Sequence, residues 1–180
     1  NSRSLKFFPN KLIGNYYDSE NEIDLEITNS MIIKKSTLKD TFNVKVLSEV
    51  EILKGDTLVN TKTFEKTFVK RVNDTLFTNV LFKDTIFSIN KENVLKKMKG
   101  YYFLNIKHSE NNWVVKKLYL KNGLLNLNDI STKEEIEMLE EITETKKDSS
   151  ETFVIKPTKK QFREFVKKNG FSKGEVYLKI

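Results

Sequence analysis

The chain has 180 residues, of which 38% are hydrophobic and 32% are charged, a balance that favours one folded domain and excludes wholesale disorder. It contains no cysteine, which excludes thiol catalysis and thiolate metal sites. The formal charge is +7, but 29 of the 32 basic residues are lysine, whereas base and phosphate recognition depends on arginine. We interpret the lysine excess as compositional background and expect no nucleic-acid partner.

Residues 1–10 are predicted to be an N-terminal tether, polar at first and ending in Phe7-Phe8-Pro9. No apolar run approaches the roughly 18 to 20 residues that span a bilayer. The sequence starts at Asn1 rather than at a methionine, which suggests that a secretion signal was removed. Any membrane contact is then expected only through an N-terminal lipid anchor. Residues 11–180 are predicted to form a single domain, β-rich over 11–89 and mixed over 90–180.

The first half of that domain is predicted to be an antiparallel meander of short strands. Residues 22–29 alternate between charged and apolar side chains, as a half-buried strand does. An Asp-Thr pair followed by an apolar residue occurs four times, at Asp40, Asp56, Asp74 and Asp84. Because Asp favours turns and Thr favours strands, each copy predicts a turn that leads into a strand.

The second half adds helices. Residues 90–99 have helical spacing and end at Gly100, a residue suited to a left-handed cap. Capping boxes at 131–134 and 158–161 predict helices that reach about Glu144 and Asn169-Gly170, with Gly170 as a left-handed cap. Strands are predicted between and after them, at 101–108, 113–121, 124–127, 153–155 and 175–180, and Asn122-Gly123 is predicted to be a two-residue hairpin turn. The expected fold class is α+β, an antiparallel meander, sheet or barrel-like, with two or three helices in the C-terminal half.

Residues suited to catalysis are sparse. His108 is the only histidine, so it would have to be the base of any serine nucleophile, and a solvated turn residue is the commoner interpretation. Five carboxylates alternate from Asp18 to Glu26, but an extended strand spreads them in a row, and the central glycine of a calcium loop is missing. We therefore expect no catalytic residue, no metal and no cofactor.

The best candidate for partner binding is a basic stripe on the last helix. Lys159, Arg163 and Lys167 are four residues apart and share one helical face. Residues 156–168 carry a net charge of +5, and residues 131–144 carry −5. The stripe predicts an acidic partner. The alternative is that the two helices are neighbours whose charges offset each other.

Aromatic residues on the predicted strands raise the alternative of a ligand pocket. Tyr17, Tyr102 and Trp113 could line a cavity inside a curled sheet and hold a small apolar ligand. Ordinary core packing explains such residues more often.

Two resemblances bear on function. Leu12-Ile13-Gly14-Asn15-Tyr16 resembles the first strand of lipocalin-like barrels, with Tyr16 where that family has tryptophan, which implies a carrier of a small apolar ligand. The Asp-Thr turns, the lysine and asparagine richness and the segment 155–162 resemble small exported lipoproteins of flavobacteria-like bacteria. This resemblance implies a periplasmic or outer-membrane-anchored location. The function expected is therefore a non-catalytic binding or accessory domain of the cell envelope whose partner is another envelope protein, with the carrier as alternative and an enzyme third.

Overall fold

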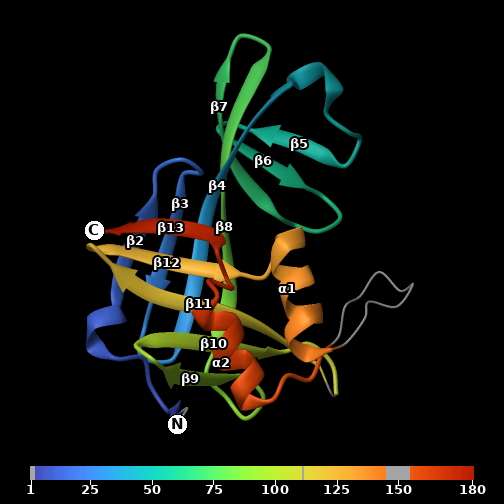
Figure 1. Cartoon of the computed structure of the whole chain (residues 1–180). Coiled ribbons are helices and arrows are strands. Elements are labelled where there is room, and N and C mark those ends of the chain that lie inside the picture. Colours follow the sequence, from blue (N-terminus) through green and yellow to red (C-terminus); the bar gives the residue numbers. More distant parts are fainter. Residues whose placement is uncertain (1–2, 111, 145–154) are drawn as a thin grey trace.

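Antiparallel strands joined by tight turns make up most of the structure, a computed structural model that describes residues 3–110, 112–144 and 155–180 (Figure 1). In the described residues, thirteen strands form one sheet in the order β1-β9-β10-β11-β12-β13-β2-β3-β4-β8-β7-β6-β5. The first and last strands of this order, β1 and β5, are not paired with each other in the described residues, so the sheet is open.

The strands of the first half are β1 (Arg3–Leu5), β2 (Gly14–Asp18), β3 (Ile23–Ile27), β4 (Met31–Asn43), β5 (Glu51–Lys54), β6 (Thr57–Asn60), β7 (Lys66–Val72) and β8 (Thr75–Ser88). The second half has β9 (Val94–Met98), β10 (Tyr101–Lys107), β11 (Trp113–Lys121), β12 (Leu124–Asp129) and β13 (Lys173–Lys179). The two α-helices of the described residues are α1 (Lys133–Thr143) and α2 (Lys159–Lys167), and single 3-10 turns cover Asn10–Leu12 and Val44–Val46.

The main core lies between two layers of the same sheet. Leu95, Leu104 and Leu118 from β9–β11 share one buried cluster with Ile32 and Phe87 from β4 and β8, which are distant in strand order. The sheet therefore curls over, so that β9–β13 face β2–β4 and the lower part of β8 (Figure 1). Each layer buries one of its faces against the other layer, and these two faces are thereby removed from water.

A second core lies on the outer face of β9–β11, where both helices pack. Met98 and Phe103 from the strands join Leu139 from α1 and Phe165 and Val166 from α2. Strands β9 and β10 are therefore covered on both faces, and this placement positions the groove described below.

A third, small core holds together an arm that projects above the helices (Figure 1). There the far end of β4 pairs with β8, β8 pairs with β7, and β6 and β5 continue the sheet, around Leu58, Val69 and Leu76. The long strands β4 and β8 thus run through both the main body and the arm.

The predicted α+β class is wrong. The structure is mostly antiparallel sheet, with 53% strand and only 16% helix. Residues 90–99 contain strand β9 instead of a helix, and Lys99 and Gly100, both with positive φ, close its hairpin with β10. Because Leu95 faces one core and Met98 the other, β9 lacks polar alternation and its spacing imitates a helix. A meander of antiparallel strands is nevertheless the arrangement within the sheet.

The four Asp-Thr pairs occupy two kinds of position in the structure. Asp56 and Asp74 lie in two-residue turns that lead into β6 and β8, as predicted. Asp40 and Asp84 instead lie inside the long strands β4 and β8. Asp84 is tolerated there because it lies opposite Lys34, and opposite charges on paired strands attract.

Part of the predicted tether belongs to the sheet. Residues Arg3–Leu5 pair with β9, and Phe8 packs edge-on against Phe87 with ring centroids 5.9 Å apart. The strand predicted at 153–155 lies mostly outside the described residues. None of the helices in the described part of the chain is long and apolar enough to cross a membrane.

Candidate functional site

A groove lies between helix α2 and the outer face of strands β9, β10 and β11, with a volume of about 270 Å³. This is slightly below the range of about 300–1,000 Å³ that is usual for small-molecule sites. Two of the residues predicted to bind a partner, Lys159 and Arg163, line it.

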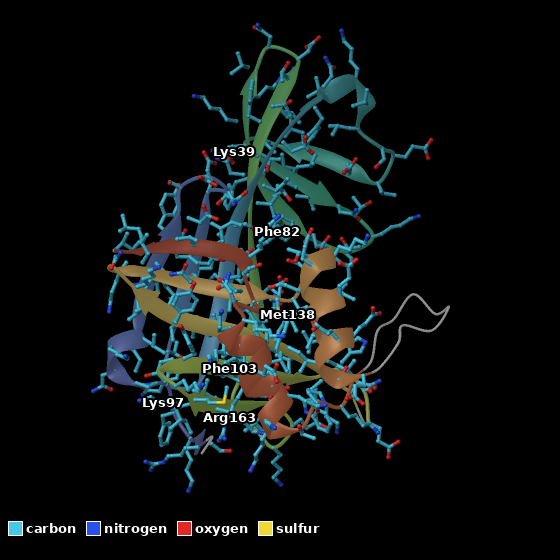
Figure 2. All side chains as sticks on the ribbon, viewed as in Figure 1. Lys39, Phe82, Lys97, Phe103, Met138 and Arg163 are labelled. Atoms are coloured by element: carbon cyan, nitrogen blue, oxygen red, sulfur yellow. The ribbon has the colours of Figure 1, made fainter. Side chains whose placement is uncertain are left out.

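The floor of the groove is apolar. Met98, Phe103 and Val115 contribute from the strands and Phe162 from α2. The rings of Phe103 and Phe162 meet edge to face at 5.1 Å between centroids, and Phe171 lies 5.8 Å from Phe103. This arrangement suits the charge distribution of aromatic rings and therefore stabilises the packing of the floor. Figure 2 shows Phe103 beside α2, with Arg163 on that helix.

The rim of the groove is cationic. Lys96 from β9 joins Lys159 and Arg163, which are one helical turn apart on α2. None of the ion pairs among the described residues includes any of these three cations. The first turn of α2 also contains no acidic residue, although a helix N-terminus favours negative charge. A carboxylate at this rim would therefore be stabilised.

Capping fixes the helix that presents these cations. The Thr158 side chain accepts a hydrogen bond from the Gln161 backbone, and the Gln161 side chain accepts one from the Thr158 backbone, as the predicted capping box requires. Gln161 Nε2 also donates to the Ile142 carbonyl at 3.0 Å and thereby ties α2 to α1. The first turn of α2 is thus held in place by its own capping box and by the hydrogen bond to the neighbouring helix α1.

A buried lysine supports the far end of α2. Lys117 on β11 donates to the Gly170 carbonyl at 2.9 Å and lies 5.3–5.6 Å from the ring centroids of Tyr101, Tyr119 and Phe171. Burial lowers the pKa of Lys117, and the charge of Glu135 partly opposes this shift. Because its ammonium is enclosed, we assign Lys117 to structure rather than to binding.

Glu135 performs a similar role for α1. This buried carboxylate accepts hydrogen bonds from the backbone N–H groups of Ser131, Thr132 and Ser172. Burial alone would raise its pKa, but these three donors outweigh burial and lower it. The predicted capping box is displaced by one residue, since Thr132 and Glu135 form it.

The third residue of the basic stripe lies outside the groove. Lys167 is exposed at the end of α2 and does not line the cavity. Helices α1 and α2 are neighbours, as the charge-offset alternative supposed. However, the ion pairs described for them, Lys133–Glu137 and Glu164–Lys168, each lie within one helix. Groove residues Lys96, Phe103 and Phe162 were not predicted to bind a partner, because only the fold brings β9 and β10 beneath α2.

The three predicted pocket residues do not converge. Tyr102 is only 1% exposed and belongs to the main core, whereas Trp113 is 50% exposed at the start of β11. Tyr17 lies on the opposite face of β2 from the buried Tyr16. Tyr16, Tyr102 and Tyr177 instead fill the space between the two layers of the sheet.

The other candidate groups have local partners. Glu22 and Glu26 of the acidic row pair with Lys39 and Lys35, and Asp18 accepts hydrogen bonds within its own turn, which lower its pKa. The described residues contain no group of three or more side chains placed to hold a metal ion. The backbone of His108 closes the loop to Asn112, and its ring is exposed.

Neither a family model, nor a curated protein, nor a solved structure matches this chain. The groove's own chemistry therefore carries the functional argument.

Proposed function

We propose that this protein is a non-catalytic binding domain that holds an acidic segment of a partner protein in the groove under α2. The observation that carries the proposal is the rim of Lys96, Lys159 and Arg163, which have no ion-pair partner among the described residues, around an apolar floor.

Both parts of this surface select for the same kind of segment. The planar guanidinium of Arg163 can bind a carboxylate through two parallel hydrogen bonds, and the lysines add less directional attraction. The floor of Phe103 and Phe162 offers an apolar contact, which is favourable by about 25 cal/mol for each Å² removed from water. A segment with Asp or Glu flanking one large apolar side chain satisfies both requirements.

The size of the groove favours a side chain over a free ligand. Its volume of about 270 Å³ holds an anchoring side chain but is smaller than usual sites for small molecules. The carrier alternative has less support also because Tyr102 and its neighbours fill the interior of the sheet. The cell-envelope location, and hence the identity of the partner as an envelope protein, stays a prediction.

The test measures binding of a fluorescent peptide, with one Phe between acidic residues, by anisotropy. Lys159→Glu and Arg163→Glu should each weaken binding by about tenfold or more, because each turns an attraction into a repulsion. Replacing the Phe of the peptide by Ser should also weaken binding, since it leaves the floor uncovered.

Lys160→Glu and Lys167→Glu are matched controls, because they make the same charge change on the same helix outside the groove. Weakening of equal size in the controls would show that only the general charge of α2 matters and would contradict the proposal. Tighter binding of a fluorescent fatty acid than of the peptide would favour the carrier instead.

A further inference from the structure

The end of the molecule opposite the arm carries most of its net charge. Residues 3–13 and 94–102 contain no aspartate or glutamate, and their six basic residues are Arg3, Lys6, Lys11, Lys96, Lys97 and Lys99. Because the net charge of the whole chain is +7, the rest of the sequence is close to neutral. Both segments lie where the described chain begins, on the side of the body away from the arm (Figure 1), and Figure 2 shows Lys97 there.

Strand pairing brings two of these cations face to face. Arg3 on β1 lies directly opposite Lys97 on β9, and like charges opposed on paired strands destabilise the pair. Lys97 and Lys11 also approach the ring of Tyr102, each with its Nζ 5.7 Å from the ring centroid. The fold therefore gathers Arg3, Lys11 and Lys97 at one place instead of separating them.

These charges are not neutralised within the part of the chain that the structure describes. Five of the six cations are exposed and form what we call the basic end: Arg3, Lys6, Lys11, Lys97 and Lys99. None of the ion pairs within residues 3–110, 112–144 and 155–180 includes any of the five. The sixth, Lys96, lies on the other face of β9 and lines the groove under α2. The basic end is therefore a surface separate from the groove.

An apolar side chain projects from the same end. Phe7 is 66% exposed, whereas the adjacent Phe8 is buried in the main core. Because Phe8 packs against Phe87 and anchors this loop, Phe7 is held outward beside Lys6. Cations around a projecting aromatic ring suit a membrane surface, where the cations attract anionic headgroups and the ring enters the boundary between headgroups and acyl chains.

We propose that the basic end docks this protein on a membrane surface that contains anionic phospholipids. Four of its five cations are lysines, whose undirected attraction suits a fluid charged surface, whereas recognition of nucleic acids depends on the arginine fork. The folded domain makes this contact itself, in addition to the lipid anchor predicted from the sequence and without requiring one. Docking through this end points the arm away from the membrane (Figure 1).

Sedimentation with lipid vesicles over a series of lipid concentrations tests the proposal on the full chain. The wild type should bind vesicles of equal parts phosphatidylserine and phosphatidylcholine, and should not bind phosphatidylcholine alone. Lys11→Gln combined with Lys97→Gln should lower the partition coefficient by about 25-fold, since each basic residue near an anionic surface contributes about fivefold. Phe7→Ser should lower it by about threefold or more, because less apolar area enters the membrane.

Lys54→Gln combined with Lys62→Gln is the matched control, because it removes the same charge from two exposed lysines of the arm. It should leave the partition coefficient unchanged, since exposed charges are screened within about 10 Å at 0.1 M salt. Equal weakening in this control, or equal binding to phosphatidylcholine alone, would overturn the proposal. Tighter binding to a single-stranded oligonucleotide than to the vesicles would overturn it as well and would assign the basic end to nucleic acid.

The same variants separate this proposal from the peptide groove. Lys11→Gln combined with Lys97→Gln leaves every residue that lines the groove intact, so this variant should bind the acidic peptide as the wild type does. Loss of vesicle binding with peptide binding retained is the expected result. Either proposal can therefore fail without the other.

Discussion

At the scale of single residues, the turn after α2 needs a glycine because a side chain packs closely against it, and not because the backbone there is left-handed. The sequence predicted Gly170 as a left-handed cap, but Asn169 and Phe171 have the positive φ angles, 67° and 62°. Gly170 is required because a Cβ there would lie 2.4 Å from ring carbons of Phe165. Its carbonyl also accepts the hydrogen bond from Lys117. The glycine therefore lets α2 and the buried lysine approach closely.

Gly170→Ala should lower the free energy of unfolding by about 1–3 kcal/mol, because the added methyl group overpacks the aromatic cluster. The loss would be measured from urea denaturation midpoints. Asn169→Gly serves as the control, since glycine accepts positive φ without strain, and it should change stability by only a few tenths of a kcal/mol. An unchanged midpoint for Gly170→Ala would show that Phe165 moves aside freely.

At the scale of elements, local signals were sufficient where one or two residues define the structure. Asn122-Gly123 was predicted as a hairpin turn, and both residues have the positive φ that this turn needs. The capping box at Thr158 was predicted from four residues. Strand β9 was missed because its two faces meet two different cores, so its burial depends on partners more distant in the sequence.

Glu135 joins α1 to the turn after α2, and its titration should appear in the pH dependence of stability. Its folded-state pKa is below the ordinary value of 4.5, so its contribution is present above pH 4.5 and is lost as pH falls through the lowered pKa. Glu135→Gln should therefore cost about 1–3 kcal/mol at pH 7, because three backbone N–H groups lose a charged acceptor.

The difference between wild type and Glu135→Gln should shrink as the pH is lowered to about 3, below the unfolded-state pKa. Urea denaturation at both pH values measures it, with the exposed Glu141→Gln as control. A difference that is independent of pH would mean that Glu135 acts through shape and not through charge.

At the scale of the whole molecule, the candidate site combines features that the sequence shows only separately. The stripe of Lys159, Arg163 and Lys167 was visible in the sequence because helical spacing is local. The sequence did not show which of the three residues line the groove. Lys159 and Arg163 line it because β9 and β10 lie beneath them, and Lys167 does not. The aromatic residues were visible as strand residues, but only the curl of the sheet decides that Tyr102 faces the core and Trp113 faces solvent.

The division of the sheet between body and arm also predicts unequal stability. Among the described residues, the arm core has three buried apolar residues, one of them Leu76, whereas the main core has fourteen, including three tyrosines. Because local stability follows buried apolar contact, backbone amides of β5, β6 and β7 should exchange with solvent through openings that require about 2 kcal/mol or more less free energy than those of β10–β12. Residue-resolved hydrogen exchange at low denaturant concentrations measures both sets.

Strands β4 and β8 supply an internal control for this experiment, because each runs through both regions. Amides of Phe42 and Leu76 should exchange with the arm, and those of Ile32 and Phe87 with the main body. If all of these amides opened together at the global free energy of unfolding, the two long strands would be transmitting the stability of the body to the arm. The arm would then be a rigid extension of the sheet, and its small core would not set its stability.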